Sequence, residues 1–405
     1  MRRVKLGQIC EVVSGGTPKT NVEEYWNGEF NWITPAEIND NDYIISDTKR
    51  KITQLAIEKK KLPLLPKGTV LLSSRAPIGK VAITGKEMYC NQGFKNLICS
   101  DEICNEYLYW YLKSKKEYLN SLGRGATFKE ISKKIVENIE IKLPEIERQR
   151  KIVDKLKKVD KIIQRKKNQS RLLDVVVQAR FVEMFGDPVQ NTKGWSIDTC
   201  KNLTSKIGSG ATPKGGRESY CTEGIAFVRS MNVYNNRFEY GDLAFINDEQ
   251  ANKLSNVMVQ HKDVLLNITG ASVARCCIVP DELIPARVNQ HVAIVRCKEK
   301  ILPEFLCSMF TEDNYQKLLW RIATSGGATR EAITKQHIEN LVLIVPPMKL
   351  QEDYVRFSER VNKSKFVIHK FLYCTTHNTQ SIIKPRPNTK ESGKTRGGKP
   401  YADEF

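Results

Sequence analysis

Basic and amide side chains recur beside glycines in two separate regions of this chain. In the first half the candidates are Lys19, Lys49, Arg50, Lys51, Arg75, Lys80 and Gln92. In the second half they are Lys214, Arg217, Asn235, Arg237, Arg275 and Gln290. Lys and Arg can neutralise phosphates, while Arg, Asn and Gln can bind the edges of bases. Nearby glycines allow a backbone to approach its ligand closely. The residue types therefore predict contacts with a nucleic acid.

The candidates differ in whether the two halves share them. The Asn-Gln dipeptides at 91–92 and 289–290 occupy equivalent places, so they could be elements of the fold. Identical residues are poor discriminators if the halves read different bases. The divergent stretches are better candidates for base readers. They contain Lys49, Arg50 and Lys51 in one half, and Asn232, Asn235, Asn236 and Arg237 in the other.

The charge of the whole chain supports the same interpretation. The net charge is +19 over 405 residues. Such an excess favours a polyanionic partner, and nucleic acid is the first choice for a soluble chain. A single charged run is usually only a solvated surface, but the excess here extends over the chain.

Motifs for catalysis are not found in the sequence. There is no GxxxxGK[ST] loop for ATP and no GxGxxG motif after a strand. Val345-Pro346-Pro347-Met348 comes nearest to an amino-methyltransferase motif but lacks its amide. The acidic loops Asn39–Asp42 and Asp248-Glu249 could be metal sites, although solvated loops are the simpler interpretation. We therefore predict no catalytic residue and no metal ligand in this chain.

These side chains must be positioned by a larger framework, whose clearest element is the stretch from Pro144 to Phe185. It contains no internal Pro or Gly. Its apolar residues recur every three or four places, at Ile152, Leu156, Val159, Ile163, Leu173, Val177 and Met184. This spacing predicts a helix of roughly 60 Å with a seam for another helix. Lys166 and Ser170 interrupt the seam, so an ordinary surface helix is the alternative.

A second helical stretch follows about 200 residues later, a period too long for a solenoid unit. Gln149 corresponds to Gln351, and each is preceded by an apolar strand ending in proline. The predicted second seam consists of Phe357, Val361, Ser364, Ile368 and Phe371. The chain therefore repeats as a globular half followed by a long helix.

Other blocks recur in the same order in both halves. Each half contains a Gly-x-Thr-Pro-Lys loop, a strand at 68–74 or 263–269, an Asn-Gln pair and a Gly-Ala-Thr segment. A short helix is expected at 55–61 and a longer one at 106–122. The predicted ranges are a first globular domain at 1–143, a long helix at 144–188, a second domain at 189–345, a second helix at 346–383 and a disordered basic tail at 384–405.

The predicted fold class is mixed α/β, with two similar domains separated by two long helices packed as an antiparallel coiled coil. This layout resembles the specificity subunit of type I restriction–modification enzymes. The resemblance rests on the ordered blocks above, on Pro144-x-x-x-x-Gln149 and on the Glu183–Pro188 segment. It extends over nearly the whole chain except the tail. Each motif is weak alone, but their order, found twice, is specific.

The resemblance implies that each globular half is a target recognition domain reading one part of a split double-stranded DNA site. It also implies two modification subunits and motor–nuclease restriction subunits. S-adenosylmethionine, ATP and Mg would then be used only by those partners, with no cofactor in this chain. The alternatives from the residues alone are a stand-alone nuclease or methyltransferase with an unrecognised active site, and a basic scaffold for RNA.

An apolar cluster near the end of the first helix covers more than one helical face. It consists of Leu172, Leu173, Val175, Val176, Val177, Phe181 and Phe185. Because a two-helix seam buries only one face, we expect Val176, Phe181 and Phe185 to bind a modification subunit. Packing against the chain's own recognition domain is the alternative.

The expected location is the cytoplasm. No apolar run approaches the length of about 18 residues that a membrane helix needs. The first residues, Met1 to Lys5, lack the apolar segment of a signal peptide. The scattered cysteines suit a reducing compartment.

Overall fold

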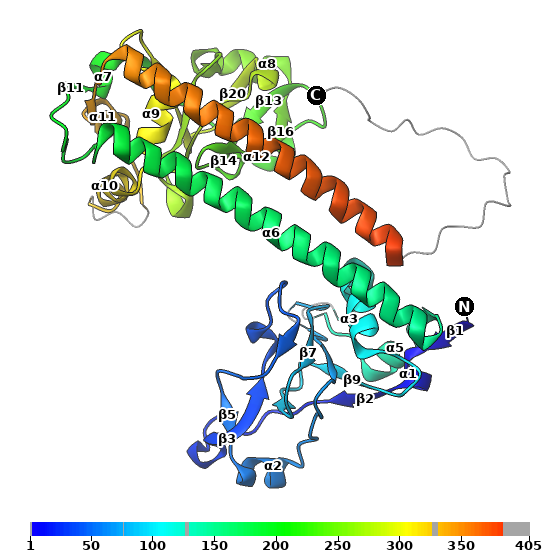
Figure 1. Ribbon diagram of the computed structural model, residues 1–405. Helices are drawn as coiled ribbons and strands as arrows, with labels where there is room; N and C mark the ends of the chain where they lie inside the picture. The colour runs from blue at the N-terminus through cyan, green and yellow to red at the C-terminus, as the bar shows by residue number, and fades with distance from the viewer. Residues whose placement is uncertain (1, 76, 126–128, 326–330, 384–405) are drawn as a thin grey trace, which may run out of the picture. The chain divides into compact units, whose positions relative to one another are not determined.

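The computed structural model describes residues 2–75, 77–125, 129–325 and 331–383 (Figure 1). The chain forms two compact units. The first comprises Met1–Lys166 together with Lys370–Phe405, and the second comprises Lys167–His369. The predicted tail at 384–405 lies outside the described residues, as do the Gly-Ala-Thr segments except for Gly125.

The first unit contains a globular half built from sheets and short helices. Its helices are α1 (Leu6–Ile9), α2 (Gln54–Lys60), α3 (Asn105–Lys113), α4 (Lys116–Ser121) and α5 (Lys133–Glu137), with 3-10 turns η1 (Glu23–Tyr25) and η2 (Pro35–Glu37). Its strands are β1 (Arg2–Lys5), β2 (Cys10–Ser14), β3 (Trp26–Ile33), β4 (Ile44–Ile45), β5 (Lys51–Ile52), β6 (Val70–Leu72), β7 (Val81–Thr84), β8 (Tyr89–Cys90), β9 (Lys95–Cys99) and β10 (Glu140–Leu143).

The second unit repeats this order. Its helices are α7 (Cys200–Leu203), α8 (Asp248–Lys253), α9 (Pro303–Phe310), α10 (Asp313–Thr324) and α11 (Lys335–Glu339), with 3-10 turns η3 (Gly216–Ser219), η4 (Ser230–Asn232), η5 (Ser255–Val257), η6 (Gly270–Ser272) and η7 (Asp281–Leu283). Its strands are β11 (Ile197–Thr199), β12 (Thr204–Ser209), β13 (Ile225–Val228), β14 (Val233–Tyr234), β15 (Arg237–Phe238), β16 (Ala244–Ile246), β17 (Met258–Val259), β18 (Val264–Asn267), β19 (Cys276–Ile278), β20 (Ala286–Val288), β21 (Val292–Cys297) and β22 (Val342–Ile344).

The sheets of the two units share a core of corresponding strands. The first unit has a five-stranded sheet in the order β2-β9-β6-β7-β4 and a three-stranded sheet, β5-β3-β8. The second has four-stranded sheets in the orders β12-β21-β18-β19 and β16-β13-β20-β17. The three-stranded sheet of the first unit contains one parallel pair, β3 with β8. The sheet β16-β13-β20-β17 of the second unit contains the corresponding parallel pair, β13 with β20. The predicted duplication is therefore present in the topology.

A buried glutamine ties each globular half to the long helix that follows it. The side-chain oxygen of Gln149 accepts from the backbone N–H of Cys104 at 2.8 Å, and its amide nitrogen donates to the carbonyl of Pro144 at 2.9 Å. In the same way, the side-chain oxygen of Gln351 accepts from the backbone N–H of Leu302 at 2.9 Å, and its amide nitrogen donates to the carbonyl of Pro346 at 2.9 Å. Both side chains are fully buried. Since a buried amide must be satisfied, the Pro-x-x-x-x-Gln motif has a structural explanation.

The predicted long helices are α6 (Ile146–Phe185) and α12 (Met348–Ile383). Within the second unit they run antiparallel, because residues with increasing numbers along α6 contact residues with decreasing numbers along α12. Ser170 Oγ lies 3.0 Å from His369 Nε2, Asp174 pairs with Lys365, and the Arg180 guanidinium lies 5.8 Å from the Phe357 ring. The predicted fold class is confirmed.

The polar interruption at Ser170 belongs to the helix contact. Ser170 is 8% exposed and meets His369 across the seam. A polar pair at such a position can fix the register of two helices. The second seam differs from its prediction, because Ser364 and Phe371 are exposed. Lys365, with 18% of its side chain exposed, takes the position expected for Ser364.

The helix expected at 106–122 is interrupted. It divides into α3 and α4, with Ser114 and Lys115 between them. The Ser114 hydroxyl donates to the carbonyl of Tyr111 at 2.7 Å, and Lys115 has a non-helical ψ of 17°. Serine can bond to its own helix backbone in this way and end the helix locally.

Candidate nucleic-acid interface

The Gly-x-Thr-Pro-Lys loop of the first half packs against the Asn-Gln turn. The Thr17 hydroxyl hydrogen-bonds to Gln92 Oε1, and the N–H of Gly16 donates to the carbonyl of Cys90 at 2.9 Å. A Cβ on Gly15 would lie 2.3 Å from that same carbonyl oxygen, so the approach requires glycine. Burial raises the pKa of the Cys90 thiol to about 12, so the thiol beneath the loop stays protonated.

The second half repeats this arrangement. The Thr212 hydroxyl hydrogen-bonds to Gln290 Oε1, and the N–H of Gly210 donates to the carbonyl of Asn289 at 3.1 Å. A Cβ on Gly210 would lie only 1.7 Å from the carbonyl oxygen of Val288. The contact between the two motifs is therefore one element of the duplicated fold.

Within the Asn-Gln pair the two residues have different surroundings. Asn91 Oδ1 accepts from the N–H of Gly93 at 2.9 Å, and Asn289 Oδ1 accepts from the N–H of His291 at 3.0 Å. These asparagines shape the turn. Gln92 and Gln290 remain exposed beside it. Because the carbonyl end of each glutamine faces a threonine, the NH₂ group of Gln92 is the end left for another partner, whereas that of Gln290 lies 3.2 Å from His291 Nε2.

Two tryptophans connect the first loop with Arg50. Trp32 Nε1 donates to the carbonyl of Gly16 at 3.0 Å, and Trp26 Nε1 donates to the carbonyl of Lys19 at 3.2 Å. The Arg50 guanidinium lies 3.8 Å from the Trp26 ring centre and 5.2 Å from that of Trp32. Such a contact stabilises an exposed cation by about 0.5–1 kcal/mol. The fold therefore brings Lys19 and Arg50 to one surface from distant segments.

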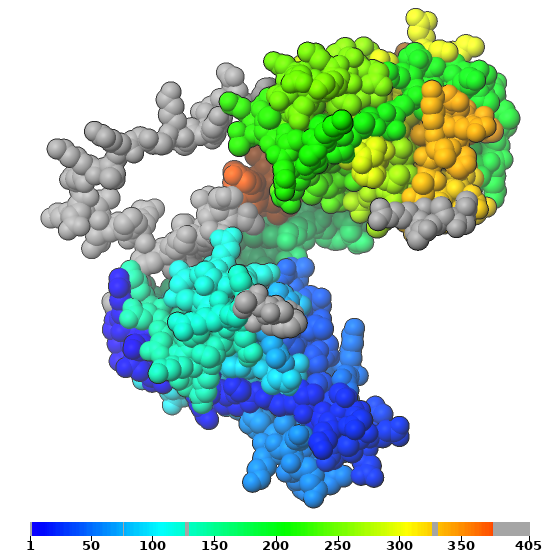
Figure 2. All heavy atoms as spheres, turned by 180° about the vertical axis from the view of Figure 1, so that it is seen from behind, coloured from blue at the N-terminus to red at the C-terminus, as the bar shows by residue number. Residues whose placement is uncertain are grey.

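Other candidates of the first half have internal partners. Lys80 Nζ donates to the carbonyl of Pro35 at 2.9 Å, and Lys51 Nζ lies 3.5 Å from Asp47 Oδ1. The side chain of Lys49 is exposed. The N-terminal segments that carry the loop lie at the surface of this unit, in dark blue in Figure 2.

Arg75 belongs to a charged group at the exit of β6. Its Nη1 lies 3.9 Å from Glu130 Oε2, and Lys95 Nζ lies 3.1 Å from Glu130 Oε1. A Cβ on Gly93 would lie 3.6 Å from Arg75 Nε, which places Arg75 beside the Asn-Gln turn. Only 10% of the Lys95 side chain is exposed, so Glu130 balances a largely buried charge.

The sequence matches Arg275 with the turn that holds both Arg75 and Lys80, and the backbone register decides between them. The N–H of Ser73 donates to the carbonyl of Lys80 at 2.9 Å, and that of Asn267 donates to the carbonyl of Arg275 at 2.8 Å. Arg275 is therefore the counterpart of Lys80 and not of Arg75. Thr269 occupies the place of Arg75. The sequence comparison could not decide here because the turn in the second half has a different length.

The second half is uncharged where the first has its charged group. Thr269, Ala293 and Ala332 stand at the places of Arg75, Lys95 and Glu130, as the strand pairing shows. The Thr269 hydroxyl lies 2.6 Å from His291 Nδ1, and Gln290 Nε2 lies 3.2 Å from His291 Nε2. Both ring nitrogens of His291 therefore lie within hydrogen-bond distance of polar side chains. The two halves thus present different groups on a common framework.

Three more candidates of the second half gather around Tyr234. The guanidinium of Arg275 lies 4.5 Å from its ring centre and that of Arg237 lies 5.0 Å away. Asn235 Oδ1 accepts from the N–H of Cys276 at 3.2 Å, so this amide supports the hairpin. Lys214 and Arg217 are exposed on the loop that follows Thr212.

Sequence reasoning missed His291, Thr269 and Arg229. Arg229 lies over the Tyr220 ring, 5.5 Å from its centre. A search for aromatic pairs equivalent to Trp26 and Trp32 would have found Tyr220 and Phe227, and hence this arginine. His291 follows the repeated Asn-Gln pair, and its place next to that pair was the available signal.

The expectation that Phe181 and Phe185 bind a partner is wrong. They are 1% and 0% exposed and belong to the core of the second unit. The Phe185 ring packs against Phe305 at 4.8 Å and Tyr354 at 5.6 Å between ring centres. The end of α6 docks on its own domain, and large aromatic rings are the residues such docking buries.

The rest of the apolar cluster has an exposed part. Its exposed members are Leu172 (49%), Val175 (49%) and Val176 (45%), and Val182 (45%) extends the surface along α6. Val176 therefore remains available for a partner. We call these four side chains the α6 apolar surface.

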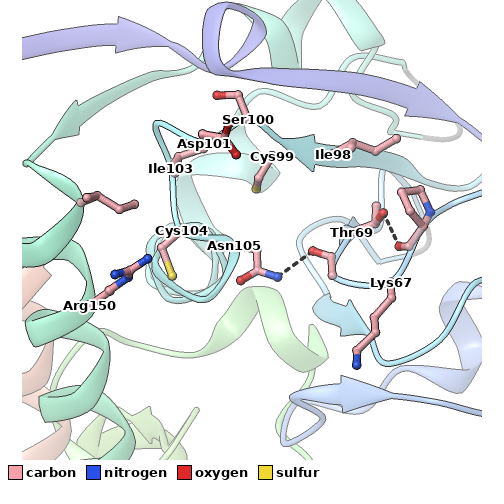
Figure 3. A pocket seen from close by; sticks show the side chains of 13 residues that line it. Lys67, Thr69, Ile98, Cys99, Ser100, Asp101, Ile103, Cys104, Asn105 and Arg150 are labelled. Carbon is pink, nitrogen blue, oxygen red and sulfur yellow. Dashed lines mark hydrogen bonds between the residues drawn. The ribbon is translucent and has the colours of Figure 1, made fainter.

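A cavity of about 330 Å³ lies elsewhere in the first unit (Figure 3). Its lining includes Lys67, Asn105 and Arg150, and the Asn105 amide donates to the carbonyl of Gly68 at 2.9 Å. None of the predicted nucleic-acid-binding residues lines this cavity.

The acidic loops considered as metal sites have other partners. Asp40 Oδ1 accepts from Lys116 Nζ at 2.8 Å, a hydrogen bond that lowers the pKa of Asp40. Among the described residues there is no group of three His, Cys, Asp or Glu side chains arranged for a metal ion. No described helix is long and apolar enough to cross a membrane.

Comparisons with known proteins identify the family. The family model of the type I restriction modification DNA specificity domain matches residues 1–171. The MjaIX specificity subunit of Methanocaldococcus jannaschii is 33% identical over 379 residues, covering 86% of this chain and 84% of that protein.

Solved structures support the fold. A chain from a type I restriction–modification system superposes with a TM-score of 0.58 at 17% identity, covering 94% of this chain and 96% of that one. The S subunit from M. genitalium gives a TM-score of 0.51 at 13% identity, covering 95% of both chains. The protein described here belongs to the family of type I restriction enzyme specificity subunits, the DNA-recognition and non-catalytic components of these systems.

Proposed function

We propose that each recognition domain reads one half of an asymmetric bipartite site in double-stranded DNA, and that the chain directs adenine methylation or cleavage by its partners. As a specificity subunit, the chain acts in a complex with DNA and other restriction–modification subunits. Two modification subunits and the restriction motor–nuclease subunits are the proposed partners. They would bring S-adenosylmethionine, ATP and Mg, and the complex would act in the cytoplasm.

One observation carries this proposal. Both halves hold a Thr–Gln pair in the same way, yet the groups around it differ. Arg75 beside the first pair carries a permanent positive charge, whereas Thr269 and His291 beside the second present hydroxyl and imidazole groups. A common framework with different donors and acceptors is what reading two different base sequences requires. The comparisons favour neither a stand-alone nuclease or methyltransferase nor an RNA scaffold.

The proposed partner surface is the α6 apolar surface. Its aliphatic side chains are about half exposed and lie close together on α6, whereas Ile162, the other exposed aliphatic side chain of the helix, lies ten residues earlier than Leu172. Exposed apolar patches of this kind usually mark an interface. A modification subunit is the proposed occupant.

Exchange of one domain tests the bipartite reading. Residues 1–143 are replaced by the corresponding domain of a relative with a known methylation site, and the modified adenines are mapped across the genome. We expect one half of the site to change and the other half and the spacer to stay. A change in both halves would refute independent reading, and a chimera of the second domain at 189–345 provides the reciprocal control.

A further inference from the structure

Each recognition domain holds an arginine above a pair of aromatic rings. In the first domain the Trp26 and Trp32 ring centres lie 5.1 Å apart, and Arg50 covers them. In the second the centres of Tyr220 and Phe227 lie 5.6 Å apart. Arg50 lies near both tryptophan rings, whereas the contact of Arg229 is with the Tyr220 ring.

One ring of each pair occupies an equivalent place in the duplicated fold. The N–H of Asn91 donates to the carbonyl of Ile33 at 3.0 Å, and the N–H of Asn289 donates to the carbonyl of Val228 at 3.0 Å. The residues before these carbonyls, Trp32 and Phe227, therefore correspond. Their arginines come from different positions in the chain, because Arg229 directly follows β13 whereas Arg50 lies just before β5.

The two arginines differ in the hydrogen bonds that their guanidinium groups make within the chain. Arg229 Nη2 donates to the carbonyl of Asp242, and its Nε is buried without a hydrogen-bond partner among the described residues. Arg50 is exposed, and in the described part of the chain no carboxylate pairs with its guanidinium. Stacking fixes the plane of a guanidinium but leaves its N–H edge available for two parallel hydrogen bonds.

We propose that Arg50 reads a guanine in the half-site of the first recognition domain. The inference rests on the proposed bipartite function and adds the base and the residue. Guanine presents two acceptors, O6 and N7, in the major groove, and an arginine edge matches both. Trp26 and Trp32 position this edge while their indoles hold the backbone of the Gly15–Lys19 loop, so the reader and the loop form one unit.

The chemistry predicts a test on the intact complex with its modification subunits. Arg50→Lys keeps the charge but removes the planar fork, and Arg50→Ala removes both. Binding is measured on duplexes that carry the methylated site with single base-pair changes. We expect wild-type discrimination at one G·C pair of the first half-site to fall by about 10- to 100-fold in both variants. Discrimination in the second half-site should not change.

Lys49→Ala is the matched control, since it removes a neighbouring exposed cation that no aromatic ring positions among the described contacts. We expect it to weaken binding to all sequences alike and to reduce the salt dependence. If Arg50→Ala behaves as Lys49→Ala does, Arg50 contacts phosphate and the proposal is wrong. Unchanged hydrogen exchange of residues 15–33 in Arg50→Lys would show that the ring pair and the loop are intact.

A failure of this proposal can be separated from a failure of the bipartite function. Suppose that the mapped site is bipartite but that the half-site whose sequence changes on exchange of residues 1–143 contains no G·C pair. Then only the Arg50 assignment is wrong. If domain exchange changes both halves or neither, the bipartite function itself falls. Arg229→Lys should have a smaller effect on discrimination than Arg50→Lys, because Arg229 is already bonded within the fold.

Discussion

Replacing Phe185 by alanine should lower the stability of the second unit and not only weaken the binding of a partner subunit. The side chain is fully buried, with ring centres of Phe181 at 5.2 Å, Phe305 at 4.8 Å and Tyr354 at 5.6 Å. Truncation of a buried phenylalanine costs about 3–5 kcal/mol, part of it from lost dispersion contacts around the cavity. Because whole domains have only about 5–15 kcal/mol of stability, this loss is severe.

The effect should be confined to one unit and visible as local unfolding. Hydrogen exchange of the full chain, followed by mass spectrometry, reports each segment separately. We expect faster exchange in α9, in the strands of the second unit and in the end of α6, with the first unit unchanged. For a unit of this size, the midpoint of thermal unfolding should fall by about 6–20 °C.

Val182→Ala is the control, because Val182 lies on the same helix but is 45% exposed. Its free energy of unfolding should stay within about 0.5 kcal/mol of the wild type. If Phe185→Ala left exchange in the second unit unchanged and only abolished binding of the modification subunit, the burial argument would be refuted and the docking role of Phe185 restored.

Two other predictions concern the helices. Inserting seven residues after Lys166 in α6 and seven after His369 in α12 preserves the heptad seam and adds about 10 Å, or about three base-pair steps. The spacer between methylated half-sites should lengthen while both half-sites stay the same, and an active variant with an unchanged spacer would contradict a ruler role. Val176→Asp combined with Val182→Ser should weaken co-purification with the modification subunit while hydrogen exchange of the second unit stays normal. A complex of unchanged stoichiometry would remove the α6 apolar surface as the dock.

The large-scale organisation was predictable because it depends on periodicity and repetition. The helical character of α6 follows from apolar residues three and four apart, which share a helical face whatever surrounds them. Of the predicted seam, however, Ile152 and Leu156 pack on the core of the first unit, and Val177 and Met184 on that of the second. The position of Gln149 and Gln351 after an apolar strand and a proline marked the duplication. These patterns are local in sequence, so a single chain reveals them.

The apolar cluster near the end of α6 shows where local information ended. The sequence showed too many apolar residues for one seam but not which of them the second domain covers. Phe181 and Phe185 are buried by Phe305 and Tyr354, residues more than a hundred positions away. Their burial depends on tertiary packing, because helical periodicity shows which face of the helix a side chain lies on but not which residues pack against it.

The candidate site was predictable as a set of residue types and only the fold made it a surface. Lys19, Arg50 and Gln92 were recognisable as candidates for DNA binding, but Trp26, Trp32 and Thr17 bring them together through contacts distant in sequence. The match of Arg275 with Lys80 needed the strand register, because a turn of different length shifts the sequence comparison. Arg50 and Arg229 reach ring pairs that share one equivalent position, Trp32 and Phe227, from different segments, which only three-dimensional packing can decide.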